Sequence, residues 1–206
     1  LAASVTGAGR SFVFGNEDDG FVIGSNVDGL TGIITADNTA GSTGSITLTT
    51  TTGSIEIAQT LMTGNASGAA TVSSGSISIF ANGGGTIFGT GFVQTGSATG
   101  TDAGAGTATS GNITLTGQEI SVDGAGTESG AFLLGIGNAS GSNTNSDGTL
   151  SATSTGTGDA GEIIVSTAQD LSVSLLDTKF NDANTVDVTV STANGTLTIA
   201  NSLSLD

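Results

Sequence analysis

The fold of this chain is decided by a stretch near its middle, Gly111-Asn112-Ile113-Thr114-Leu115-Thr116-Gly117-Gln118-Glu119-Ile120-Ser121-Val122. The stretch contains two short runs in which apolar and polar residues alternate, which is the period-two pattern of a β-strand with one buried face. It therefore predicts two consecutive strands. It also predicts that Ile113, Leu115, Ile120 and Val122 are buried and that Thr114 and Ser121 face outward.

The same unit of two alternating strands recurs along the chain. Its copies begin at Gly44, Gly75, Gly111, Gly161 and Gly195, so consecutive copies start 31, 36, 50 and 34 residues apart. Internal repeats with periods in this range are typical of solenoid proteins, in which each repeat stacks on the next. We interpret the longest interval as one repeat that carries a long insertion.

A third apolar segment follows the two strands in most copies. We place it at residues 92–93, 131–136 and 186–190, and at residues 69–72 for the copy that begins at Gly44. Three strands and a linker make one rung of a parallel β-helix, and the chain has room for about six rungs. Glycine suits the tight corners between strands, and the absence of proline suits strands that are paired on both sides. We therefore predict an all-β parallel β-helix, with a β-sandwich as the alternative.

We expect one solenoid domain over the whole chain, residues 1–206. Residues 1–9 are expected to form an N-terminal strand or a cap, residues 10–43 the first rung, and residues 44–206 the recurring rungs. Two segments rich in Gly, Ser, Thr and Asn have the composition of surface loops. We predict long loops there, at residues 95–110 and 138–160.

The chain is strongly acidic, with a net charge of −16 and only two cations, Arg10 and Lys179. Two cations cannot neutralise a track of phosphate groups, so we expect no nucleic-acid partner. For the same reason we expect no attraction to an anionic membrane surface. No apolar run approaches the length of about 18 residues that a membrane-spanning helix needs, so we expect no membrane insertion.

Two motifs carry a resemblance to a known family. The run Gly-Asn-Ile-Thr-Leu at residues 111–115, and the run Gly-Thr-Gly-Asp-Ala-Gly at residues 156–161, resemble the repeats of filamentous-haemagglutinin-like secreted adhesins and related β-strand-repeat surface proteins. The resemblance covers roughly residues 40–206. It implies a parallel β-helix, secretion across an outer membrane and a role in adhesion or biofilms. An extracellular or cell-surface location is therefore expected, with glycans or a cell surface as candidate partners.

The residue types that most enzymes use are missing. The chain has no His and no Cys, which excludes Ser–His and Cys–His nucleophilic schemes. A polysaccharide lyase or hydrolase is a less favoured alternative. A lyase would need Arg10 or Lys179 as its base, and neither follows or precedes a clear acidic cluster in the sequence. We therefore expect that the chain is not an enzyme and, calcium apart, holds no cofactor.

One acidic turn is a candidate calcium site. Asn16, Glu17, Asp18 and Asp19 are consecutive, and Asp28 follows shortly after them. Calcium prefers carboxylate and amide oxygens of this kind and takes six to eight of them. The alternative interpretation is an acidic turn that is simply solvated.

The function that fits these observations is a non-catalytic extracellular structural protein. A parallel β-helix has open strand edges at its two ends, and monomeric proteins cover such edges with a helix, a loop, proline or lysine. The sequence shows none of these devices at either end. We therefore predict head-to-tail self-assembly into a cell-surface or matrix filament. The alternative is an adhesin fragment or a carbohydrate-binding module, which the absence of Trp and Tyr makes weaker.

Overall fold

The computed structural model describes residues 1–102, 106–121, 133–142, 144–155, 163–167, 171–178, 188–192, 197–199 and 204–205. This part of the chain contains strands and turns and no helix. The strands of successive turns pair in parallel, and the one antiparallel pair among the described strands is a hairpin. The predicted parallel β-helix is therefore confirmed, and the β-sandwich alternative is wrong.

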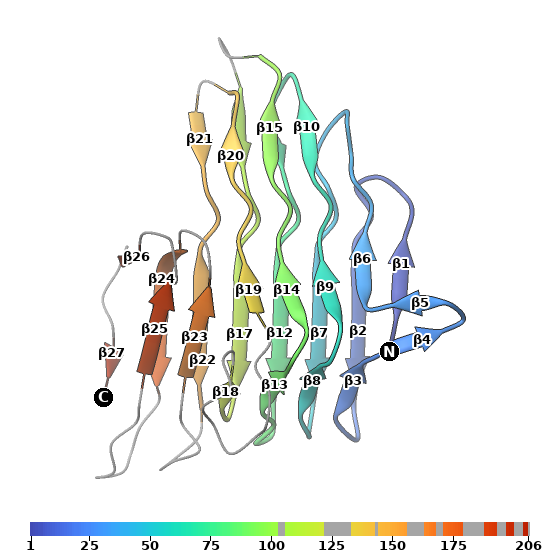
Figure 1. Cartoon of the computed structure of the whole chain (residues 1–206), viewed down its shortest axis with the longest axis vertical. Coiled ribbons are helices and arrows are strands. Elements are labelled where there is room, and N and C mark those ends of the chain that lie inside the picture. Colours follow the sequence, from blue (N-terminus) through green and yellow to red (C-terminus); the bar gives the residue numbers. More distant parts are fainter. Residues whose placement is uncertain are drawn as a thin grey trace.

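Three long sheets run along the coil (Figure 1). The first sheet consists of β2 (Phe12–Asn16), β7 (Ile46–Thr50), β12 (Ile77–Ala81), β17 (Ile113–Gly117), β22 (Leu150–Ser154), β24 (Leu171–Thr178) and β26 (Leu197–Ile199), with β27 (Ser204–Leu205) also paired to β24. The second consists of β3 (Phe21–Ile23), β8 (Ile55–Ile57), β13 (Ile87–Gly89), β18 (Ile120–Ser121), β23 (Ile163–Thr167) and β25 (Val188–Thr192). The third consists of β1 (Ala3–Val5), β6 (Ile33–Thr35), β9 (Thr60–Met62), β14 (Phe92–Gln94) and β19 (Leu133–Gly135).

Two shorter sheets and a hairpin complete the described strands. The fourth sheet consists of β10 (Ala66–Gly68), β15 (Ala98–Gly100) and β20 (Ala139–Ser140). The fifth consists of β11 (Val72–Ser73), β16 (Thr107–Thr109) and β21 (Thr144–Ser146). The hairpin, β4 (Ser25–Val27) and β5 (Leu30–Thr31), projects from the side of the first turn.

The turns differ from the predicted rungs in number and in content. From β2 to β21 the chain completes about four turns, not six rungs, and its second, third and fourth turns each have five strands instead of three. Residues 95–110, predicted to be a long loop, contain β15 and β16. Residues 138–160, the other predicted loop, contain β20, β21 and β22. The third strand of the second turn is β9, not residues 69–72.

The three long sheets enclose the main core. In the first sheet Ile46, Ile77, Ile113 and Leu150 lie in register, one per turn, and each is fully buried. Leu115 and Ile120 are also buried, and Thr114 lies on the outer face, as predicted. Val122 lies outside the described residues, and the side chain of Ser121 is not described. We call this part of the coil the main lobe.

A small lobe lies beside the main lobe, between the fourth and fifth sheets. Its core contains only small or medium side chains, Val72, Ala98 and Ala108, with Ala139 packed against them. In Figure 1 it forms the upper part of the coil, above a constriction in every described turn from β7 to β21. The small residues of the predicted loops therefore form the strands and the core of this lobe.

The constriction between the lobes, which we call the waist, is held by buried hydroxyl groups. Thr63 Oγ1 donates to the carbonyl oxygen of Gly75 across the waist (2.8 Å) and accepts from the N–H of Gly96 in the next turn (2.9 Å). Thr43 Oγ1 donates to the carbonyl oxygen of Gly64 in the opposite direction (2.9 Å). Each hydroxyl therefore joins the two walls of the waist and two successive turns.

A second polar ladder runs along the outside of the first sheet. The side-chain oxygens of Ser11, Ser45, Ser76 and Asn112 each accept the backbone N–H of the residue stacked on them in the next turn, and the last of these donors is Thr149. The donor–acceptor distances lie between 2.8 and 3.1 Å. The recurring Gly–Ser/Asn–Ile–Thr–Leu unit is thus explained by position: glycine lies at the waist, Ser or Asn in this ladder, and the apolar residues in the core.

The waist hydroxyls can be tested by removing one of them. Thr63→Val keeps the shape of the side chain but leaves the Gly75 carbonyl and the Gly96 N–H without their buried partner. We expect the free energy of unfolding to fall by about 1–3 kcal/mol, measured by urea denaturation. Thr114→Val, on the outer face, is the control and should change stability little; equal losses in the two variants would contradict the role of the waist hydroxyls.

Candidate functional site

The candidate functional site is the N-terminal end of the coil, where two strands have an open edge. Among the described residues, β2 pairs only with β7 and β3 only with β8. The N–H of Phe12 donates to Ser45 O (2.9 Å), and Asn16 O accepts from the N–H of Thr51 (3.0 Å), so these groups face the second turn. Because backbone groups alternate in direction along a paired strand, those of Val13 and Gly15 face the open end. They are free to pair with another strand.

Three aromatic rings lie under this open edge. Phe12, Phe14 and Phe21 are the first members of core columns that continue with Ile46, Leu48 and Ile55 in the second turn. The second-turn residues are fully buried, whereas the three Phe are only half-buried. Phe14 and Phe21 pack edge to face, with ring centroids 5.0 Å apart. The end of the main core is thus partly covered by its own rings and partly open to a partner.

Where the structure describes side-chain exposure, the large apolar side chains that are exposed all lie in the first turn. Val13 is 73% exposed, Val22 42%, Val27 48% and Leu30 40%. Val13 stacks on Thr47, so this outward column begins with an apolar residue and continues with a polar one. Of the four, Val13 lies on the strand whose edge is open.

The N-terminal residues and one loop contact the rest of this end. Strand β1 pairs with β6 and covers the edge of the third sheet, and the Leu1 carbonyl accepts from the N–H of Gly24 (3.0 Å). Over the small lobe, Asn38 holds a tight loop, because its Nδ2 donates to Ser42 O (2.8 Å) and its Oδ1 accepts from the N–H of Ala40 (3.0 Å). Leu1 also contacts β3, because its N-terminal ammonium donates to Val22 O (2.6 Å). Residues 1–9 therefore add a first strand to the third sheet and occupy one outward carbonyl of β3, whereas the edge of β2 stays unpaired among the described strands.

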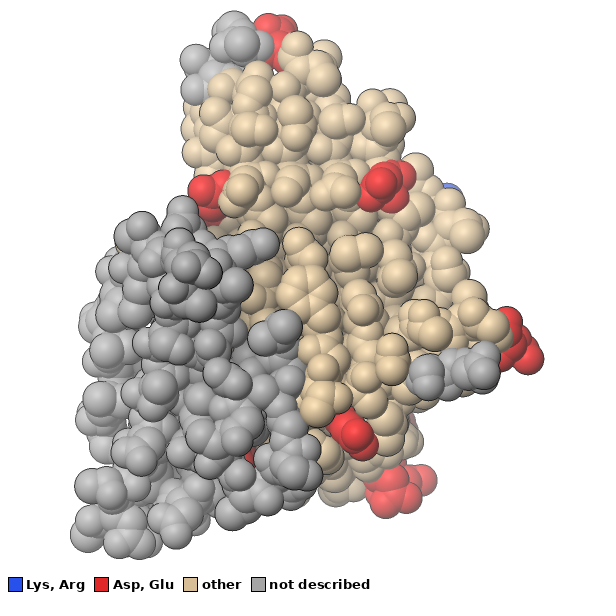
Figure 2. Space-filling model, viewed as in Figure 1, with Lys and Arg blue, Asp and Glu red and all other residues tan. Residues whose placement is uncertain are grey.

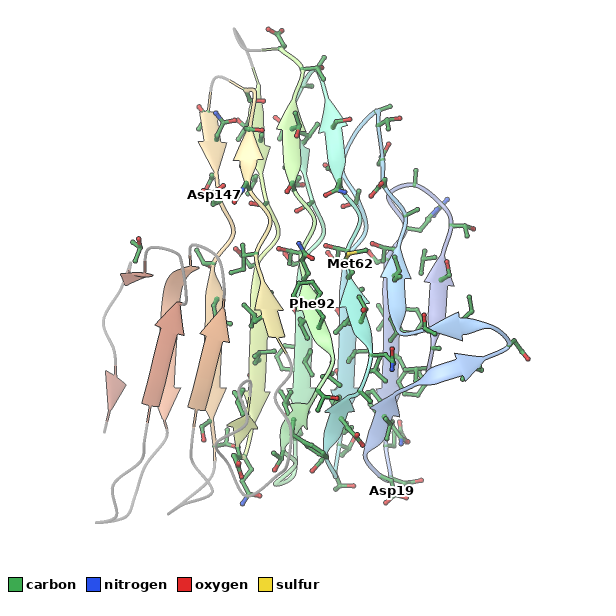
Figure 3. All side chains as sticks on the ribbon, in the orientation of Figure 1. Asp19, Met62, Phe92 and Asp147 are labelled. Atoms are coloured by element: carbon green, nitrogen blue, oxygen red, sulfur yellow. The ribbon has the colours of Figure 1, made fainter. Side chains whose placement is uncertain are left out.

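The structure keeps four of the predicted calcium residues in one turn and separates Asp28 from them. Glu17, Asp18 and Asp19 are exposed in the turn between β2 and β3, and Asn16 lies at the end of β2. Asp28 lies in the connection of the β4–β5 hairpin. In Figure 3 this hairpin projects sideways, whereas Asp19 lies at the lower end of the coil. The described residues contain no group of three or more carboxylates that could hold a metal ion. Calcium binding by the acidic turn stays a prediction.

The contacts of the acidic turn are structural. Asn16 Nδ2 donates to Gly20 O (3.5 Å) within the acidic segment. Thr52 Oγ1 donates to Asp18 O (3.1 Å), which joins this segment to the second turn of the coil. On the face shown in Figure 2 the acidic side chains are scattered, with uncharged surface between them. This arrangement fits a solvated acidic surface at least as well as a cation site.

The structure describes the position of only one of the two candidate bases of a lyase. Arg10 is exposed at the waist of the first turn, where its backbone N–H donates to Gly7 O (3.1 Å). Lys179 lies outside the described residues. In the part of the chain that the structure describes, no helix has the length and hydrophobicity to cross a bilayer.

Sequence reasoning missed the apolar residues of the open end, although a signal for them exists. At the column of Val13, the following turns have Thr47, Ser78 and Thr114. An apolar residue in the first copy, at a position that is polar in the next three, indicates that the first turn has a different environment.

No family model matches this chain, and no match is found among curated proteins or among solved structures. The resemblance of the repeats to filamentous-haemagglutinin-like adhesins therefore stays a prediction.

Proposed function

We propose that this protein is a non-catalytic structural protein of the cell surface or extracellular matrix that assembles head to tail. The observation that carries the proposal is the open end described above, where the unpaired edge of β2 lies beside half-buried Phe rings and an exposed valine, Val13. The extracellular location rests on the resemblance of the repeats to secreted adhesins.

The other end of the coil offers edges of the same two sheets. Among the described strands, β26 is the last along the first sheet and β25 the last of the second. At the N-terminal end the first sheet is open at β2, and the second sheet has one outward carbonyl of β3 bonded to Leu1. A contact between unlike ends of two copies does not close on itself and so builds a filament. The net charge of −16 opposes side-by-side clumping but is screened beyond about 8–10 Å, which leaves short-range strand pairing intact.

The edge of β2 gives a direct test. Val13→Pro removes an N–H that faces the open end and costs no bond inside the coil, since proline is tolerated on edge strands. Val13→Thr is the control, because it keeps the N–H and restores the residue type of the following turn. We expect the parent to sediment as oligomers that grow with concentration, Val13→Thr to do so with a small loss of affinity from its missing apolar contact, and Val13→Pro to sediment as a monomer.

Equal sedimentation of the two variants, at matched concentration and with the same far-ultraviolet circular dichroism, would show that the edge of β2 is not the contact.

A further inference from the structure

One column of the waist admits only glycine in the second, third and fourth turns and at the start of the fifth. A Cβ built on Gly44 would lie 1.8 Å from Arg10 O, one on Gly75 1.9 Å from Gly44 O, and one on Gly111 2.0 Å from Gly75 O. The same Cβ on Gly148 would lie 2.0 Å from Gly111 O. In each case the Cβ points at the carbonyl of the preceding turn. A side chain at this column is therefore incompatible with a turn stacked before it.

Arg10 occupies this column in the first turn. It precedes Phe12 by two residues, as Gly44 precedes Ile46, and its carbonyl is the one that a Cβ on Gly44 would meet. By the same geometry, the Cβ of Arg10 points away from the coil, toward the open end. The side chain is exposed and its Cγ lies over Gly7, 2.8 Å from where a Cβ of that glycine would be.

We infer that Arg10 is a stop residue, which prevents a second copy from continuing the coil in the register of its own turns. In that register, a main-chain carbonyl of the added strand would collide with the Arg10 Cβ, just as Arg10 O would collide with a Cβ on Gly44. This inference rests on the proposed head-to-tail assembly and specifies its geometry.

The contact that remains is limited to β2 and β3. A one-residue shift in register would turn the core side chains of the added strand outward. The partner strand must therefore be displaced by two residues, or end before the waist. The end of the coil thus accepts a second copy along the main lobe and rejects it at the waist.

Two substitutions separate the Cβ of Arg10 from its charge. Arg10→Ala removes the guanidinium group and keeps the Cβ, whereas Arg10→Gly removes both. We expect Arg10→Ala to associate as the parent does, and Arg10→Gly to associate about ten-fold more tightly, a shift easily resolved in a dissociation constant, measured by sedimentation equilibrium. Val13→Pro added to Arg10→Gly should reverse the gain, because both residues lie at the same end.

The result separates the inference from the proposed function. If the parent is monomeric and only Arg10→Gly associates, the stop role stands and native head-to-tail assembly is wrong. If Arg10→Gly, folded as judged by circular dichroism, associates no more tightly than Arg10→Ala, the stop role is overturned whatever the parent does.

Discussion

Gly75→Ala is expected to lower the free energy of unfolding by about 3 kcal/mol or more, although it adds only one methyl group. The added Cβ would lie 1.9 Å from Gly44 O and 2.5 Å from its carbonyl carbon. Overpacking of a tight interior typically costs about 1–3 kcal/mol. Here the cost should reach the upper end, because the atoms that must move are backbone and turns are stacked on both sides of them. Urea denaturation of the purified variant measures the loss.

Gly15→Ala is the matched control for this substitution. Gly15 lies in β2, and a Cβ built on it meets no atom within 4 Å. We expect its stability to stay within about 0.5 kcal/mol of the parent, as for other surface substitutions. If Gly75→Ala unfolds at the same urea concentration as Gly15→Ala, the stacked turns are not in close contact at this column, which would contradict the structural explanation.

Ile113→Asp is expected to cost roughly 5 kcal/mol, which is enough to unfold a domain of ordinary stability. Ile113 is fully buried and lies between Ile77 and Leu150 in the first sheet. The substitution removes apolar contacts in the core and places a carboxylate there without a cation to pair with. The measurement is thermal or urea unfolding followed by circular dichroism.

Thr114→Asp, one residue farther along, controls for the added charge. Thr114 is on the outer face of the same strand, so its carboxylate stays in water and should cost less than about 1 kcal/mol. The reverse order of stability in these two variants would mean that the register of β17 is wrong by one residue.

The main lobe could be predicted from sequence because large apolar residues mark it. Ile113, Leu115 and Ile120 alternate with polar residues, and this alternation alone places them in the core. The small lobe could not be predicted in the same way. Strands such as β16, Thr107–Thr109, contain only small residues, and in sequence they cannot be told from a Gly/Ser/Thr-rich loop.

The lack of large apolar residues also explains why the predicted repeats in the second half of the chain do not match the observed turns. Strand β22, Leu150–Ser154, belongs to the first sheet, but Ala152 stands where the earlier turns have Leu48, Ile79 and Leu115. The sequence around it therefore predicts a loop. The next strongly apolar run, residues 163–165, follows Gly161 as the run 113–115 follows Gly111, which predicts a strand of the first sheet, whereas β23 pairs with β18 in the second.

The candidate site was only partly predictable. Open edges at the end of the coil follow from the fold class, but the sequence does not show that β1 covers the third sheet or that Arg10 lies at the glycine column of the waist. Both depend on which residues of different turns are stacked. The proposed calcium residues were close in sequence, yet Asp28 was separated from the others by a hairpin that no repeat predicts.

Electron microscopy of the purified chain tests the central claim most directly. Head-to-tail assembly through β2 and β3 predicts unbranched filaments one coil wide, whose length increases with protein concentration and which are absent from Val13→Pro. Separate particles of the size of one chain, at every concentration and with or without calcium, would contradict it.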